Sequence, residues 1–254
     1  QNLASTITQM GWQYLSIGPA SRANLEDFKV ISELLALTPT VFAAGTIASG
    51  DRLFPGAAAA AATVIVENSR TSKDGFTNLR FAALANVPPY APFLPAAYGN
   101  ANESPSIGLA VECADEVVKA FEKTPSIEIA RSTLLFQLES NAAKIERLCQ
   151  KICIEHQVIF RGFDFSPAPY PEDWCSLGKA IESLGITSLG LSGSLAAAAI
   201  VASTLDQGKW RKCGFNGLML PVLEDSILAQ RAAVGTLTIK DLLLYSAVCG
   251  TGLD

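Results

Sequence analysis

The short apolar runs of this chain are continuous and do not alternate with polar residues, and this feature constrains the fold most. Thr40–Gly45 reads Thr-Val-Phe-Ala-Ala-Gly, and Phe81–Asn86 is another short apolar run. Strands of this kind are buried on both faces, as in parallel sheets covered by helices. Longer segments with helical spacing lie between them, such as Glu26–Leu37 with Phe28, Ile31 and Leu35. Helices that alternate with short buried strands predict an α/β fold, either a barrel or an open sheet.

The same patterns predict the order of elements along the chain. Strands are expected over residues 40–45, 63–66, 81–86, 106–113, 160–165 and 216–223. Helices are expected over residues 26–37, 57–62, 113–122, 126–156, 174–184, 195–205, 224–233 and 239–246, with Gly185 as a left-handed stop. Neither a repeat nor a linker divides the chain, so a single α/β domain over residues 1–254 is predicted.

Composition excludes several classes of protein. Hydrophobic residues make up 49% and charged residues 17% of the chain, which excludes disorder and suits a large subunit interface. We therefore expect a homo-oligomer or a subunit of a complex. A net charge of −5 without a basic stripe argues against nucleic-acid binding. The longest apolar stretches, residues 57–66 and 195–203, are too short to span a membrane.

The six cysteines and the single histidine limit the chemistry. No Cys-x-x-Cys pair is present and His156 is the one histidine, which argues against a zinc site and against hydrolases that need a Ser-His or Cys-His pair. Scattered thiols fit a reducing compartment, so a soluble intracellular protein is expected, in the cytoplasm or in an organelle with a reducing lumen.

Polar residues follow several of the expected strands, where ligands bind in α/β folds. The positions found in this way are Glu67, Asn86, Asp164, Glu224 and Asp225. Carboxylates there could act as general acids or bases or hold a hard cation. The alternative for Glu224 and Asp225 is that they complement the dipole of the following helix.

Two glycine-containing turns offer further candidates. Gly190–Ser194 precedes an Ala-rich helix, so its N–H groups could bind an anion, or its small residues could serve packing and capping. Cys249 begins the run Cys-Gly-Thr-Gly-Leu-Asp254, where a thiol could meet a ligand or could be a buried cysteine before a turn.

Four segments in order carry a family resemblance from about residue 45 onward. They are residues 80–98 (Arg-Phe-Ala-Ala-Leu-Ala-Asn-Val-Pro-Pro-Tyr-Ala-Pro-Phe-Leu-Pro-Ala-Ala-Tyr), 162–169 (Gly-Phe-Asp-Phe-Ser-Pro-Ala-Pro), 216–225 (Asn-Gly-Leu-Met-Leu-Pro-Val-Leu-Glu-Asp) and 249–254 (Cys-Gly-Thr-Gly-Leu-Asp). The chain resembles the domain-of-unknown-function family 711, also called uncharacterised protein family 210. The resemblance implies a β/α barrel similar to the ten-stranded barrel of pyruvate formate-lyase, without the glycyl-radical motif. It also implies a longer protein, with family sequence on both sides of this chain.

The resemblance bears on the candidate residues as well. Asp164, Glu224, Asp225, Cys249 and Asp254 match the family pattern. Two family histidines are replaced, one by Gly99 and one within Ser192-Gly-Ser-Leu195, which weakens the case for acid–base chemistry.

Two functions are therefore expected. The first is an enzyme-like protein that binds or acts on a small polar molecule bearing a carboxylate or phosphate, in an acidic pocket at a barrel mouth. Its catalytic residues would be Asp164, Glu224, Asp225 and Cys249, and its ligand-binding residues Asn86, Ser192, Asp254 and Glu67. A divalent metal held by Asp164, Glu224 and Asp225 is one candidate cofactor. The second is a non-catalytic ligand-binding regulator or structural subunit, so whether the chain is an enzyme stays open.

Overall fold

A computed structural model describes residues 2–100, 102–122 and 124–253 of the chain. Internal contacts divide it into two compact units, Gln1–Glu103 and Ser104–Asp254, called here the first and second unit. The single domain over residues 1–254 stays a prediction.

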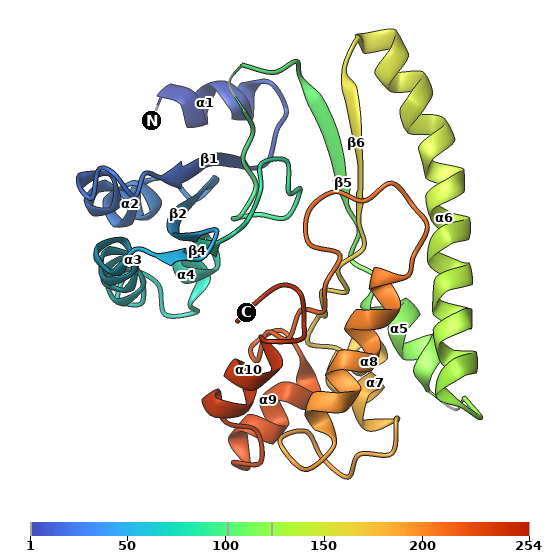
Figure 1. Cartoon of the computed structure of the whole chain (residues 1–254). Helices are drawn as coiled ribbons and strands as arrows, with labels where there is room; N and C mark the ends of the chain where they lie inside the picture. Colours follow the sequence, from blue (N-terminus) through green and yellow to red (C-terminus); the bar gives the residue numbers. More distant parts are fainter. Residues whose placement is uncertain (1, 101, 123, 254) are drawn as a thin grey trace. The chain divides into compact units, whose positions relative to one another are not determined.

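The first unit contains a mixed sheet with three parallel strands, β1 (Leu15–Ala20), β2 (Val41–Ser49) and β4 (Phe81–Ala85). β2 pairs in parallel with both β1 and β4, and the two-residue strand β3 (Arg52–Leu53) turns back on its end. The connecting helices are α2 (Glu26–Leu37) and α3 (Pro55–Asn68), which pack against each other (Figure 1). The unit also contains α1 (Asn2–Gln9) and the short helix α4 (Phe76–Leu79).

The solid apolar run of β2 is explained by this packing. Val41, Phe42, Ala43 and Ala44 are all buried, as expected for a central parallel strand. A Cβ atom at Gly45 would lie 2.1 Å from the ring of Phe28 on α2. Only glycine therefore lets the helix approach the strand so closely at this point.

Arg80 ties the end of α2 to the sheet. Its guanidinium is buried and donates hydrogen bonds to the carbonyl oxygens of Leu35 (2.7 Å), Thr38 (2.6 Å) and Val41 (3.2 Å). These carbonyls lie at the C-terminus of α2 and the start of β2, so a cation there satisfies acceptors that the helix leaves open.

The strand predicted over residues 63–66 is wrong. The β-branched residues Thr63 to Val66 continue α3, which runs to Asn68. Ala57, Ala61, Val64 and Asn68 recur at helical spacing and are buried together, so tertiary packing overrides the strand propensity of the β-branched residues. Glu67 therefore lies within a helix and does not follow a strand.

The second unit contains a pair of parallel strands and most of the helices. β5 (Ser106–Ala110) pairs with β6 (Ile159–Asp164), and α5 (Ala114–Phe121) and the 30-residue helix α6 (Ile127–His156) connect them. α6 packs along β6 (Figure 1). The helices that follow are α7 (Leu177–Glu182), preceded by a 3-10 turn at Asp173–Cys175, then α8 (Ser194–Asp206), α9 (Ser226–Ala233) and α10 (Ile239–Tyr245).

Aromatic side chains fix the end of β6 in the core. Phe160, Phe163, Phe165 and Trp210 form a chain of ring contacts with centroid separations of 5.2, 5.3 and 5.0 Å. Asp164 is the last residue of β6 and lies between Phe163 and Phe165 in the sequence. Because both rings belong to the core, the Asp164 side chain is buried at the carboxyl end of the strand.

The strand predicted over residues 216–223 is also wrong. The segment forms one isolated bridge, between Leu218 and Gly250, and is otherwise irregular. Asn216 has a positive φ of 49° and Pro221 has no N–H to donate, so the backbone leaves the extended ladder although Leu218 and Leu220 are buried.

The α/β class is confirmed. Over the described residues the strands form two open sheets and no barrel. No helix in the described ranges is long and apolar enough to cross a membrane.

Candidate functional site

Asp164 organises the carboxyl end of β6. Its side chain is fully buried, and Oδ1 accepts hydrogen bonds from the N–H of Ser166 (3.0 Å), the hydroxyl of Ser166 (2.6 Å) and the N–H of Asn216 (2.9 Å). Oδ2 accepts from the N–H of Phe215 at 2.6 Å. Burial raises the pKa of Asp164, and these hydrogen bonds oppose the rise. The carboxylate therefore holds the 215–217 turn against β6.

Asp225 joins the starts of two helices. It is the N-cap of α9, where Oδ1 accepts from the N–H groups of Ile227 and Leu228 at 3.0 Å each. Oδ1 also accepts from the Ser176 hydroxyl, which caps α7, and Oδ2 accepts from the N–H of Gly178 at 3.1 Å. The interpretation of Asp225 as a residue that complements a helix start matches this geometry.

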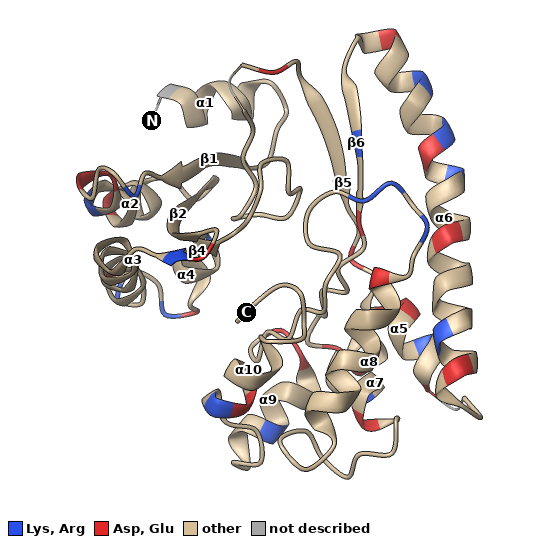
Figure 2. Ribbon diagram, in the orientation of Figure 1, with Lys and Arg blue, Asp and Glu red and all other residues tan. Residues whose placement is uncertain are grey.

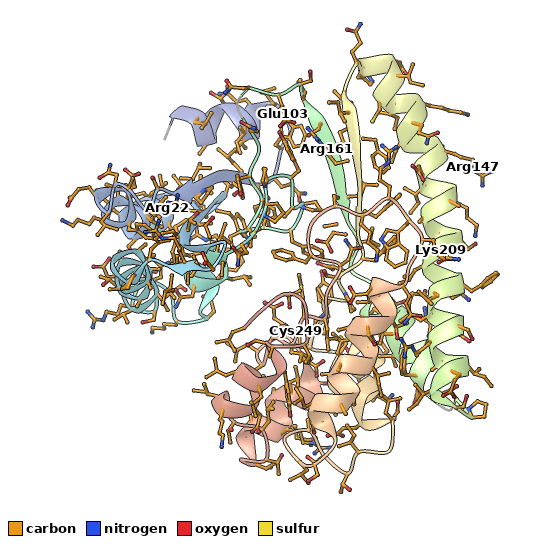
Figure 3. All side chains as sticks on the ribbon, in the orientation of Figure 1. Arg22, Glu103, Arg147, Arg161, Lys209 and Cys249 are labelled. Atoms are coloured by element: carbon orange, nitrogen blue, oxygen red, sulfur yellow. The ribbon has the colours of Figure 1, made fainter. Side chains whose placement is uncertain are left out.

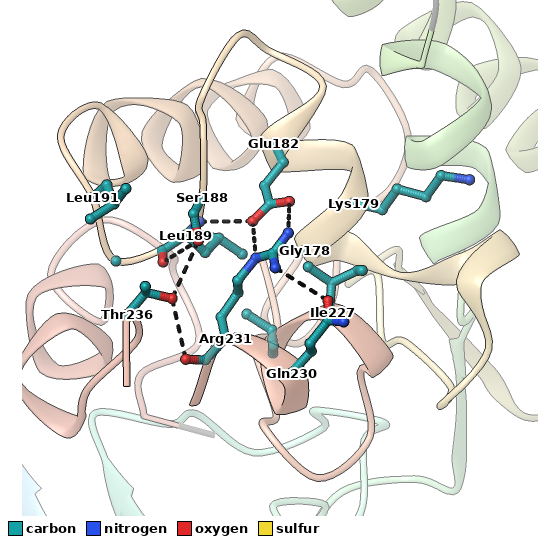
Figure 4. Close-up of polar contacts among 12 residues, drawn as sticks. Gly178, Lys179, Glu182, Ser188, Leu189, Leu191, Ile227, Gln230, Arg231 and Thr236 are labelled. Carbon is teal, nitrogen blue, oxygen red and sulfur yellow. Dashed lines mark hydrogen bonds and ion pairs between the residues drawn. The ribbon is translucent and has the colours of Figure 1, made fainter. Parts of the chain in front are cut away.

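The Gly190–Ser194 turn is held by bonds within the unit (Figure 4). Glu182 and Arg231 form a two-point ion pair, with Nε to Oε1 at 2.7 Å and Nη2 to Oε2 at 2.8 Å, and Glu182 also accepts from the N–H of Leu189. The N–H of Gly190 donates to the Tyr245 hydroxyl at 3.1 Å. The N–H groups of Gly190, Leu191 and Ser194 are thus already donated within the unit, which favours packing over anion binding at these three positions. Ser192 is exposed on this turn.

Cys249 lies on the loop after α10, as Figure 3 shows, and is buried. Its Sγ accepts from the N–H of Gly252 at 3.2 Å and contacts the Thr251 hydroxyl at 3.4 Å. The N–H of Leu218 donates to the carbonyl of Cys249 at 2.7 Å, and the N–H of Gly217 donates to the Ser166 hydroxyl at 3.0 Å. These bonds connect Cys249 through residues 216–218 to the Asp164 region.

Glu224 is half-buried, and in contrast to Asp164 and Asp225 its carboxyl group accepts no hydrogen bond from the residues that the structure describes. Burial raises the pKa of Glu224, and the charge of Glu112 raises it further. The polar interaction of Glu112 with the Tyr170 hydroxyl and the charge of Glu112 raise the pKa of Tyr170, and the charge of Glu224 adds to this rise. Figure 2 shows acidic positions in red where β5 and β6 end. We call Glu112, Tyr170 and Glu224 the acidic triad.

The acidic triad lies at the ends of both parallel strands. Glu112 lies two residues beyond the last residue of β5, Ala110, and Tyr170 lies in the loop after β6. This is the end of a parallel sheet at which α/β proteins bind ligands. A pair of carboxyl groups that share an environment retains a proton more readily than either alone, so the triad suits hydrogen-bond donation or proton transfer.

The remaining predicted residues belong elsewhere. Asn86 follows β4 as expected, is exposed, and its amide donates to the carbonyl of Gly50 at 3.1 Å. Glu67 is exposed on α3. Both are in the first unit, and Asp254 lies outside the described residues.

Over the same ranges no group of three or more His, Cys, Asp or Glu side chains is arranged to hold a metal ion. Asp164, Glu224 and Asp225 accordingly do not form such a group. All six cysteines are described and free. Burial raises the pKa of the Cys113 thiol, and it raises that of Cys213 to about 11, so both stay protonated at neutral pH.

The sequence prediction missed Glu112 and Tyr170. Glu112 was expected inside a strand over residues 106–113, but β5 ends at Ala110. If the strand had been predicted to end at Ala110, Glu112 would have been selected as a polar residue that follows a strand. Tyr170 lies six residues beyond β6 and carries no local signal of its own.

Comparison with known proteins connects the chain to one family. The family model described as Uncharacterised ACR (DUF711) matches residues 8–254. The chain belongs to the DUF711 family.

Curated relatives in this family are named UPF0210 proteins. The one from Pyrobaculum arsenaticum is 32% identical over 184 residues, covering 69% of this chain and 41% of that protein. The one from Pyrobaculum aerophilum is 34% identical over 184 residues, with the same coverage. The one from Oleidesulfovibrio alaskensis is 29% identical over 203 residues, covering 76% of this chain and 44% of that protein. The chain thus spans less than half the length of these relatives.

Proposed function

We propose that the second unit binds a small polar molecule at the acidic triad and that Glu224 serves there as a proton donor. The observation that carries this proposal is the half-buried Glu224 carboxyl, whose pKa is raised by burial and by Glu112 at the carboxyl ends of β5 and β6. A carboxylic acid with a raised pKa is suited to general acid catalysis near neutral pH.

The chemistry of the triad narrows the ligand class. Protonated Glu224 and the Tyr170 hydroxyl can both donate hydrogen bonds to an oxygen of the ligand. A negatively charged Glu112 repels a phosphate dianion more strongly than a carboxylate monoanion, since Coulomb energy scales with the product of the charges. Within the expected class of carboxylate- or phosphate-bearing molecules, the triad favours a carboxylate.

The pH dependence of binding provides the test. A panel of small carboxylates and phosphate esters is screened by thermal shift on the wild type, since a ligand at 100 times its Kd stabilises by about 2.7 kcal/mol. Carboxylate affinity should fall as the pH rises through the pKa of Glu224. In Glu224→Gln the amide still donates a hydrogen bond but does not titrate, so binding should persist with a flat pH profile.

Two further variants complete the design. Tyr170→Phe should weaken binding, whereas Glu155→Gln, which changes an exposed carboxyl on α6, should leave it unchanged. A wild type that binds none of the panel, or a Glu224→Gln variant with the wild-type pH profile, rules out the proposal.

A structural role without catalysis is the second candidate. It is favoured by Asp164 and Asp225, since each is fully buried and accepts four hydrogen bonds from the protein itself. Exposed apolar side chains, Leu223 at 84% and Ile154 at 80%, suit a subunit interface. Light scattering that finds only monomers across a wide concentration range would count against a homo-oligomer.

The wider architecture is also proposed. The parallel pairings β1–β2–β4 and β5–β6, each with helical connections, support membership of a larger β/α barrel such as that of pyruvate formate-lyase. An experimental structure of a full-length DUF711 protein tests this, and open sheets in that structure would refute it.

A further inference from the structure

A buried asparagine in the first unit lacks partners for its side-chain amide. Asn68 ends α3 and is 0% exposed, yet neither its Nδ2 nor its Oδ1 hydrogen-bonds to any described residue. It lies on the buried face of α3, one turn beyond Val64. A buried polar group without a partner costs on the order of 1–3 kcal/mol, so a partner for Asn68 is expected.

A second residue with an unpartnered side-chain atom is Asn78, the third residue of α4. Its Nδ2 donates to the carbonyl of Ile65 on α3 at 3.1 Å, and its Oδ1 is buried without a partner among the described residues. The Ile65 carbonyl also accepts from the N–H of Ser69, the residue after Asn68. Because a helix carbonyl points along the axis toward the residues three and four positions on, the Asn78 amide lies beside the backbone of Asn68. α3 and α4 are neighbours in Figure 1.

The unpartnered atoms match the hydrogen-bonding capacity of water. Asn68 Nδ2 is a donor, and the Oδ1 atoms of Asn68 and Asn78 are acceptors. Water donates two hydrogen bonds and accepts others, and buried waters typically make about three. An anion would leave both Oδ1 acceptors unsatisfied, and a cation would leave the Asn68 Nδ2 donor unsatisfied.

We propose that ordered water binds between Asn68 and Asn78 and completes the hydrogen bonds of both amides. In this arrangement the water connects the C-terminal end of α3 to the Phe76–Arg80 segment by hydrogen bonds. It also gives Asn68 a role that is independent of the acidic triad.

A crystal structure of the 254-residue chain, at a resolution that shows ordered water, tests the site directly. The expected result is a density peak within about 3.2 Å of the Asn68 amide and of Asn78 Oδ1. Direct contact between the two amides, or no peak between them, would overturn the proposal. An anomalous signal there would indicate a metal ion and would overturn it equally.

A double-mutant cycle tests the coupling in solution. Asn68→Leu and Asn78→Leu should each lower the Tm. The double variant should lower it by clearly less than the sum, because the first substitution already removes the bridge. Additive losses, or a higher Tm in Asn68→Leu, would contradict the bridge. If Asn68→Leu fails to fold, the crystal structure of the wild type still decides.

Discussion

The Ser176 hydroxyl donates a hydrogen bond to the Asp225 carboxylate at 2.7 Å, and this contact joins the N-termini of α7 and α9. The same carboxylate accepts from the N–H groups of Ile227 and Leu228 in the first turn of α9 and from the N–H of Gly178 on α7. One buried side chain therefore sets the relative position of two helices.

Replacing Asp225 should destabilise the chain strongly. Asp225→Ala removes an N-cap and leaves several buried donors unpaired, so we expect the free energy of unfolding to fall by about 3 kcal/mol. Urea denaturation followed by circular dichroism measures this. The control is Asp173→Ala, an exposed carboxylate that accepts from the Ser226 hydroxyl, for which a loss of roughly 0.5 kcal/mol is expected. Equal losses in both variants would show that Asp225 does not join the helices.

Glu224 should make stability depend on pH in a defined direction. Its folded pKa is raised, so the folded state binds more protons than the unfolded state between the two pKa values. The stability that this proton contributes is complete below the unfolded pKa of about 4.3 and is lost as the pH rises through the folded pKa. Relative to wild type, Glu224→Gln should therefore gain stability with rising pH, by on the order of 0.5 kcal/mol. Thermal melts from acid to neutral pH measure the difference, and a difference that shrinks as the pH rises contradicts the assignment.

Asp164→Asn should cost far more than its small change in shape suggests. Both carboxylate oxygens accept hydrogen bonds. If the amide NH2 of the asparagine replaces Oδ2, it faces the N–H of Phe215, and if it replaces Oδ1, it faces the donors of Ser166 and Asn216, so a donor meets a donor in either orientation. We expect a loss of about 2–3 kcal/mol, at the upper end of the values for hydrogen bonds to a charged group. Chemical denaturation gives the value, with Asp206→Asn at the exposed end of α8 as the control. A loss below that of the control would refute the role of Asp164 in holding the 215–217 turn.

Alanine substitutions at two glycines distinguish the energetic cost of a left-handed backbone conformation from the cost of a close contact with the added Cβ atom. Gly190 (φ 90°) and Gly235 (φ 80°) are both left-handed, but a Cβ atom would lie 1.7 Å from the carbonyl oxygen of Thr236 at Gly190 and would meet nothing within 4 Å at Gly235. Gly235→Ala should cost about 1–2 kcal/mol from conformation alone. Gly190→Ala should cost clearly more and should loosen the turn at Leu189, measured by hydrogen exchange. Similar losses at the two positions would mean that the contact with Thr236 relaxes without cost.

Several parts of the fold could be predicted because local pattern and tertiary packing agree. Glu26–Leu37 has its apolar residues on one helical face, and α2 has those bounds. Gly185 was expected as a left-handed stop and has a φ of 95° shortly after α7 ends. Where propensity and packing disagreed, as at residues 63–66, packing decided, because burying Val64 and Asn68 with Ala57 and Ala61 requires a helix.

The sequence by itself determined the α/β class, most helices and the family of this protein, because solid apolar runs, helical spacing and ordered motifs are properties of neighbouring residues. Only the tertiary structure decided which partners each acidic side chain has. Asp164 and Asp225 each accept two hydrogen bonds from neighbouring residues and two from residues about 50 positions away, whereas Glu224 interacts electrostatically with Glu112 and Tyr170. Burial and long-range hydrogen bonds set the charge state of a carboxylate, and neither can be obtained from spacing along the chain.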